Sequence, residues 1–175
     1  MTSNIFLLDT NIVSETQKRR FGPELMRWLH ANWPVAIPYP VILEVRFGIL
    51  QRQRDDPAGA AKLRLWYDAL LETEPEFPAM TMGIAELQAQ MLEVPYLKNL
   101  WINQSPKGRR PPGQDLCIAA IAIEHQMPIA TLNTKDFLQI NQYFPLPGVL
   151  DPVSGVWAVQ PVGESQSAWF SRGLV

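Results

Sequence analysis

The chain lacks several features that would have pointed to particular classes of protein. Its single cysteine, Cys117, excludes an internal disulfide and reads as a small buried apolar residue. No apolar run approaches the roughly 18 residues that a membrane span needs, and no basic segment followed by an apolar one marks a secretory signal at the N-terminus. The 15 basic and 17 acidic residues nearly balance, so the net charge points to no particular partner. We therefore expect a soluble, cytoplasmic protein.

The length and composition of the chain favour a single folded domain. With 175 residues and 47% hydrophobic content, it can bury one substantial core. Short apolar runs alternate with longer amphipathic segments, which predicts an α/β fold with a mostly parallel central sheet. Strands are expected at residues 4–8, 35–37, 79–82 and 129–133, with an edge strand at 149–150.

The helices are predicted from apolar periodicity and from their start and stop signals. They are expected from Asp9 to Arg20, from Pro23 to Leu29, from Pro40 to Arg54, at 58–72, at 84–91 and at 116–125, with a short turn beginning at Asp136. Residues 94–114 are rich in proline and glycine and predict a long loop with at most one turn of helix. Residues 151–175 show no period, so no element is predicted there.

Four carboxylates stand at the joints between these strands and helices. Asp9 and Asp136 follow the strands at 4–8 and 129–133, while Glu44 and Asp115 lie in the first turns of helices. The carboxyl ends of parallel strands meet at one edge of a sheet, where α/β proteins bind their ligands. The sequence therefore predicts that all four carboxylates converge on one cleft.

Such a cluster implies a cation, because gathered carboxylates repel one another unless a positive charge neutralises them. Oxygen ligands suit a hard divalent ion, here Mg²⁺ or Mn²⁺, which keeps several waters and supports phosphate chemistry. Taken singly, Asp9 and Asp115 could be simple helix caps and Asp136 a turn residue. Glu44 is harder to explain as a structural residue, because both its neighbours are apolar.

Four motifs resemble the PIN-domain ribonucleases of the VapC toxin type, related to the FitB and plasmid-stability branches. They are LLDTNIVSE (7–15), VILEVRFGIL (41–50), DLCIAAIA (115–122) and TLNTKDF (131–137). The resemblance covers residues 4–150, and the last two motifs together are its most specific part. It implies a PIN domain over residues 1–150, a three-layer α/β/α sandwich with a mostly parallel sheet, and leaves 151–175 as a C-terminal extension of unknown conformation.

The resemblance also implies an activity, a site and partners. The activity would be metal-dependent endoribonuclease action by the toxin of a toxin–antitoxin system, with Mg²⁺ or Mn²⁺ as cofactor. The partners would be an RNA substrate, an antitoxin and a second copy of the chain. Residues matching the family's acidic, metal-binding and catalytic positions are Asp9, Glu44, Asp115 and Asp136, and those matching its hydrogen-bonding supports are Asn11, Thr131 and Asn133.

One departure from the family pattern concerns the helix that carries Glu44. A serine or threonine often precedes that helix in the family, whereas this chain has Pro38-Tyr39-Pro40. The source of a hydroxyl group beside Glu44 is therefore open. The loop at 94–114 is also longer than the compact family version.

Two other functions remain compatible with the motifs. A phosphatase of the haloacid-dehalogenase type would use Asp9 as a nucleophile that forms an aspartyl-phosphate. That family requires a second aspartate two positions later, where this chain has Asn11. A non-catalytic interaction module with the same fold is the other alternative, although all four carboxylates are present.

The loop that precedes Asp115 contains four basic residues and no acidic residue near them. These are Lys98, Lys107, Arg109 and Arg110. Since the loop leads into Asp115, we expect Lys107, Arg109 and Arg110 to contact the RNA backbone and to offset the negative charge of the cleft. A solvated loop that only favours solubility is the alternative.

Overall fold

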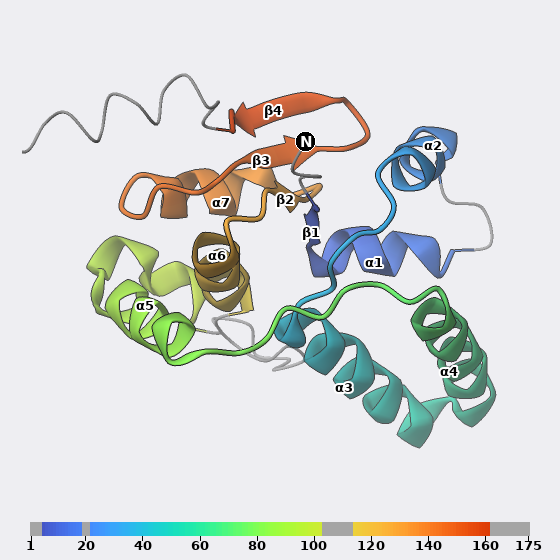
Figure 1. Cartoon of the computed structure of the whole chain (residues 1–175). Coiled ribbons are helices and arrows are strands. Elements are labelled where there is room, and N and C mark those ends of the chain that lie inside the picture. Colours follow the sequence, from blue (N-terminus) through green and yellow to red (C-terminus); the bar gives the residue numbers. More distant parts are fainter. Residues whose placement is uncertain (1–4, 19–21, 103–113, 162–175) are drawn as a thin grey trace, which may run out of the picture.

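The computed structural model describes residues 5–18, 22–102 and 114–161, and in it one four-stranded sheet lies at the centre of the fold (Figure 1). The strands are β1 (Leu7–Leu8), β2 (Ile129–Ala130), β3 (Val149–Asp151) and β4 (Val156–Val159), in the spatial order β1-β2-β3-β4. The β1–β2 and β2–β3 pairs are parallel, and β3–β4 is antiparallel. The predicted α/β fold with a mostly parallel sheet is confirmed.

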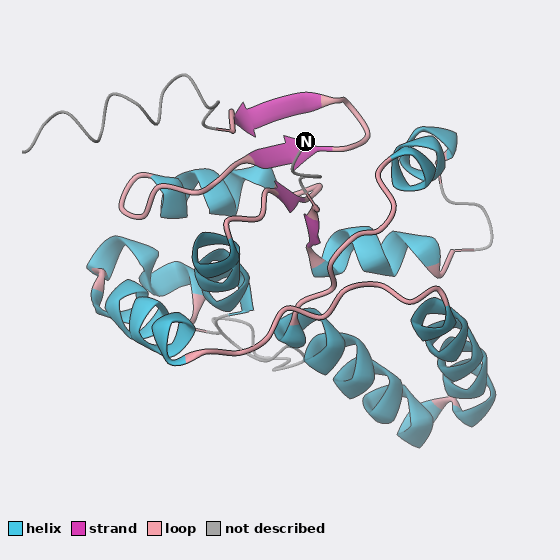
Figure 2. Ribbon diagram, in the orientation of Figure 1, coloured by secondary structure: helices cyan, strands magenta, loops and turns pink. Residues whose placement is uncertain are grey.

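Helices make up most of the described chain (Figure 2). They are α1 (Thr10–Thr16), α2 (Pro23–Ala31), α3 (Tyr39–Asp55), α4 (Pro57–Glu72), α5 (Met82–Glu93), the 3-10 helix η1 (Pro95–Leu100), α6 (Gln114–His125) and α7 (Thr134–Asn141). Proline stands at the first or second position of α2, α3 and α4, where its missing N–H has no helical partner to lose. Among the described helices, none is long and apolar enough to cross a bilayer.

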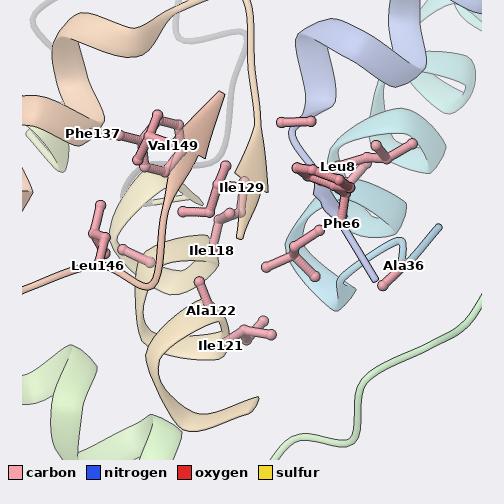
Figure 3. Packing of buried hydrophobic residues seen from close by; sticks show 14 of the residues in the cluster. Phe6, Leu8, Ala36, Ile118, Ile121, Ala122, Ile129, Phe137, Leu146 and Val149 are labelled. Atoms are coloured by element: carbon pink, nitrogen blue, oxygen red, sulfur yellow. The ribbon is translucent and has the colours of Figure 1, made fainter. Parts of the chain in front are cut away.

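Helix α6 is the central packing element. Residues 116–122 are all buried, so the helix is enclosed on every side rather than on one face. Ile118, Ile121 and Ala122 lie close to Ile129 of β2 in the core (Figure 3). Elsewhere in the core, Phe6 packs edge-on against Trp28 of α2, with 4.9 Å between ring centroids. Burial of α6 fixes the direction in which Asp115, in its first turn, enters the domain.

Helices α3 and α4 form an antiparallel hairpin around Asp56. The Asp56 carboxylate accepts a hydrogen bond from the N–H of Gly59 (2.8 Å) and caps α4. These contacts and the guanidinium of Arg52 (2.8 Å) hold the pKa of Asp56 below its ordinary value. A Cβ atom at Gly59 would lie 2.0 Å from Asp56 Oδ2, so a larger residue here would displace the Asp56 carboxylate from its present position.

Of the predicted strands, the one at 35–37 forms only in part and the one at 79–82 was wrong. Residues 35–37 lie beside β1 as expected, but Ala36 makes only isolated bridges, to Leu7 and to Glu76. Pro34 and Pro38 flank this segment and restrict the ladder. The strand predicted at 79–82 is absent from the described chain, because the pairing residue is Glu76 and Thr81 instead caps α5 by accepting from the N–H of Ile84.

Several boundaries also differ from the prediction. Helix α1 ends at Thr16 rather than Arg20, β2 covers only Ile129–Ala130, and α7 has eight residues where a short turn was expected. Strand β3 is an interior strand, because β4 pairs beyond it, and no element had been predicted at β4. Trp157 of β4 covers Phe6, with 5.9 Å between ring centroids. The sheet therefore extends past residue 150.

Candidate active site

Asp9 lies at the carboxyl end of β1, is 5% exposed, and is one of two buried polar residues in the described chain. Its Oδ1 accepts a hydrogen bond from the N–H of Thr10 (2.6 Å). Its Oδ2 accepts from Asn11 Nδ2 and from Thr131 Oγ1, both at 2.7 Å. Three donors thus fix the carboxylate in one orientation at the start of α1.

The hydrogen bonds around Asp9 join two segments that are 122 residues apart in the chain. Thr131, at the end of β2, donates to Asp9 and accepts from Asn11 Nδ2 (3.1 Å) and from the N–H of Asn133 (2.9 Å). Asn11 Oδ1 in turn accepts from the N–H of Leu132 (3.0 Å). The parallel pairing of β1 and β2 brings these groups together, because the two strands end at the same edge of the sheet.

Glu44 enters the site from α3 and is oriented by a residue that the sequence analysis did not select. The hydroxyl of Thr10 donates to Glu44 Oε2 at 2.8 Å. No serine or threonine precedes Glu44 on its own helix, where Pro38-Tyr39-Pro40 stand, and the Thr10 hydroxyl of α1 donates to it from a neighbouring helix. The signal was available in the sequence, since Thr10 directly follows Asp9 at the start of a predicted helix.

Asp136 and Asp115 are placed by α7 and α6. Asp136 lies in the first turn of α7, is partly buried, and accepts a hydrogen bond from Asn133 Nδ2. Asp115 lies in the first turn of α6, which packs against α3, the helix of Glu44. Lys107, Arg109 and Arg110 lie outside the described residues, whereas Lys98 is in η1.

The acidic groups interact electrostatically but do not form a preassembled set of metal ligands in the described residues. Within the described segments, no three His, Cys, Asp or Glu side chains are grouped closely enough to hold one metal ion as they stand. Burial, aided by the charges of Glu44 and Asp136, nevertheless raises the pKa of Asp9 from 3.8 to about 6, although the hydrogen bonds from Thr131 and Thr10 oppose the rise. Asp9 is a buried carboxylate whose charge is disfavoured by its surroundings.

This raised pKa predicts that the metal-free protein becomes less stable as the pH rises from about 4 to about 7. In that window the unfolded chain loses the Asp9 proton near pH 3.8, while the folded protein keeps it until about pH 6. Ionisation therefore favours unfolding, by about 3 kcal/mol once both states are ionised. Urea unfolding in EDTA across this range, for the wild type and for Asp9→Asn, measures the effect.

The difference between the two proteins isolates Asp9, because all other titrating groups are shared. Asparagine disturbs the hydrogen bonds of Asp9, but that disturbance does not change with pH. The unfolding free energy of the wild type should therefore fall relative to the variant as the pH rises. A difference that stays constant between pH 4 and pH 7 would show that the pKa of Asp9 is not raised.

Comparison with known proteins supports the fold. No family model and no curated protein matches the chain. Among solved structures, a chain of FitAcB from Neisseria gonorrhoeae matches with a TM-score of 0.58 and 22% identity, over 85% of this chain and 98% of that one.

Two further solved structures match in the same way. A toxin–antitoxin complex from Klebsiella pneumoniae matches with a TM-score of 0.54 and 23% identity, over 84% of this chain and 97% of that one. VapBC2 from Rickettsia felis, in a structure with a DNA fragment from its promoter, matches with a TM-score of 0.54 and 22% identity, over 77% of this chain and 92% of that one. The chain therefore has the PIN-like α/β fold that its motifs predicted, the fold of these solved proteins.

Proposed function

We propose that the chain is a metal-dependent endoribonuclease that acts as the toxin of a toxin–antitoxin pair. The observation that carries the proposal is the buried carboxylate of Asp9, fixed by three hydrogen-bond donors and lying in the field of Glu44 and Asp136. A buried charge of this kind needs a compensating cation. The fold likeness to solved toxin–antitoxin and VapBC structures favours this activity over other phosphate chemistry.

The side chains present fit a hard divalent cation. All four acidic candidates offer carboxylate oxygens, which Mg²⁺ and Mn²⁺ prefer. Mg²⁺ commonly uses one or two carboxylates and retains several waters, so it does not require a preformed group of three protein ligands. When bound, such an ion would lower the pKa of a water molecule and offset the charge that develops on the scissile phosphate.

The protein groups have separate tasks in this proposal. A carboxylate offers roughly four acceptor positions, and three of those on Asp9 are already used, two of them on Oδ2. Oδ1 is therefore the oxygen with room for a cation. Glu44, oriented by Thr10, would accept the proton of the attacking water, and Asp115 and Asp136 would complete the negative site.

The phosphatase alternative fits the geometry less well. An aspartate nucleophile needs an oxygen free to attack phosphorus, but Asp9 is 5% exposed and its Oδ2 accepts two hydrogen bonds. The residue two positions later is Asn11, which binds Asp9 rather than offering a second carboxylate. Absence of a phosphoenzyme would separate the two reactions.

We also propose two protein partners. An antitoxin would inhibit by placing an arginine or lysine among the carboxylates, in competition with the metal. A second copy of the chain would pack on apolar surface of α2 and α4, where Met26 is 42% exposed and Leu65 71% exposed.

Three basic residues of the loop before Asp115 would contact the RNA backbone. These are Lys107, Arg109 and Arg110, and this role rests on the sequence alone.

Purified protein should cleave single-stranded RNA in the presence of Mg²⁺ or Mn²⁺ and lose this activity in EDTA. The reason is that the carboxylate site repels the phosphate backbone until a cation is bound. Cleavage of a fluorescent oligoribonucleotide, with metal added back after EDTA, measures the effect. RNA cleavage at an equal rate in EDTA, or none under any metal, would overturn the proposed function.

A further inference from the structure

A groove opens beside the candidate active site, between α1, α3 and α4. Its volume is about 310 Å³, and Glu44 and Thr10 of the acidic site form part of its wall. Figure 1 shows the three helices as neighbours on one side of the molecule. Other residues that line it are Ser14 from α1, Gln17 at the C-cap of α1, Gly48 and Arg52 from α3, and Trp66 from α4.

The lining residues follow one face of each helix. Glu44, Gly48 and Arg52 are spaced by four along α3, and Thr10 and Ser14 by four along α1, so each set lies in a row. Eight residues of helix span about 12 Å, so the groove leads from a carboxylate at Glu44 to a guanidinium at Arg52. It therefore has a carboxylate at the acidic site and, at its far end, a guanidinium that is ion-paired with Asp56.

Gly48 is the feature that the fold does not explain. It lies in the interior of a helix of 17 residues, where glycine is among the least favourable residues. It is exposed, and a Cβ atom built on it would meet nothing within 4 Å. Packing and turn geometry therefore do not require glycine here. Its effect is to keep the middle of the groove open.

We propose that this groove binds one nucleoside of single-stranded RNA, next to the phosphate that is cleaved. The inference rests on the proposed ribonuclease function and adds a substrate-binding subsite to it. The scissile phosphate would lie at the end near Glu44, the base would pass over Gly48, and the neighbouring phosphate would face Arg52. Bases of a duplex are stacked and paired, so only an unpaired nucleotide can enter.

The chemistry of the wall matches such a ligand. Trp66 offers an aromatic surface to a base, and its indole N–H, which donates to Thr16 Oγ1 at 3.2 Å, fixes the ring. Ser14 and Gln17 offer a hydroxyl and an amide that can bind the edges of a base. Arg52 is exposed at the mouth of the groove; its Nε and Nη2 donate to Asp56 (3.0 and 2.8 Å), and its other N–H groups can donate to a phosphate.

Filling the groove from Gly48 tests the proposal. Gly48→Ala, Gly48→Leu and Gly48→Phe should weaken binding of a labelled single-stranded oligoribonucleotide in this order, with a loss of at least about tenfold for Phe. Fluorescence anisotropy with Mg²⁺ present, on the inactive Asp9→Asn, Asp115→Asn background, measures binding without cleavage. The thermal unfolding midpoint should not fall, because a Cβ atom at position 48 meets nothing within 4 Å and glycine is the poorer helix former.

Leu50→Phe is the matched control. Leu50 lies on the same helix, about 200° around the axis from Gly48, is 53% exposed, and does not line the groove. It adds a phenylalanine to α3 with no change at the groove, so its RNA binding should equal that of the wild type. If Gly48→Phe destabilises the fold, Gly48→Leu carries the comparison.

An abasic substrate identifies what occupies the groove. Removing the single base beside the cleavage site should weaken wild-type binding, whereas Gly48→Phe should bind the normal and the abasic oligonucleotide equally. Gly48→Leu and Gly48→Phe variants that bind and cleave RNA like the wild type would overturn the subsite and leave the ribonuclease function intact. If the Gly48→Leu and Gly48→Phe variants lose binding to an arginine-rich peptide while their RNA binding is unchanged, the groove belongs to a protein partner. That result would also overturn the nucleoside subsite.

Discussion

Replacing Asp9 and Asp115 together by asparagine should reduce metal-dependent RNA cleavage by about a thousandfold or more. Asp9 is buried at the end of β1, and Asp115 lies in the first turn of the most deeply buried helix. Neither change removes apolar packing, but both remove charge from the proposed cation site. A thousandfold loss corresponds to about 4 kcal/mol of transition-state stabilisation, the scale that metal and electrostatic contributions reach.

The control is a double variant with the same loss of charge elsewhere. Glu72→Gln with Glu93→Gln removes two exposed carboxylates that lie at the ends of α4 and α5. It should cleave RNA at the wild-type rate. Both variants should keep the wild-type far-ultraviolet circular dichroism. Full activity in the Asp9→Asn, Asp115→Asn protein would exclude these carboxylates from catalysis.

Thr131→Val should lower both stability and activity, although valine has nearly the same shape. The Thr131 hydroxyl is fully buried and makes three hydrogen bonds, to Asp9, Asn11 and the N–H of Asn133. Its loss removes one of three donors from the buried Asp9 carboxylate and an acceptor from Asn11 and from the N–H of Asn133, which costs about 1–3 kcal/mol of unfolding free energy. The Asp9 carboxylate loses one of the donors that fix it, so cleavage should fall about 10- to 100-fold, as happens when residues that orient a metal ligand are removed.

Thr131→Ser separates the hydroxyl from the methyl group. The serine variant keeps the hydrogen bonds and should retain most of the activity. The valine variant keeps the side-chain volume but should lose activity. Urea unfolding in EDTA and cleavage of the same oligoribonucleotide measure the two effects. Equal behaviour of the serine and valine variants would show that the hydroxyl has no part in the site.

The elements that the sequence predicted well are those with local signals. Pro23 and Pro57 begin helices, Asp56 separates α3 from α4, and the apolar period at 58–72 places α4 within one residue. Such signals act over a few residues and survive in an isolated segment. Apolar runs at 4–8 and 129–133 correctly located β1 and β2 but not their length. Each strand has only two residues, because pairing with neighbouring strands rather than local propensity decides where a strand ends.

By itself, the sequence determined which residues could form the site: carboxylates that follow strands or begin helices, with asparagine and threonine nearby. Only the tertiary structure decided how they act. Thr131 meets Asp9 across 122 residues of chain, Thr10 of α1 donates to Glu44 of α3, and Gly48 leaves a groove that no local pattern shows. Burial also decided the raised pKa of Asp9. Desolvation and long-range hydrogen bonds arise only when distant segments pack together, because each depends on groups that the other segment supplies.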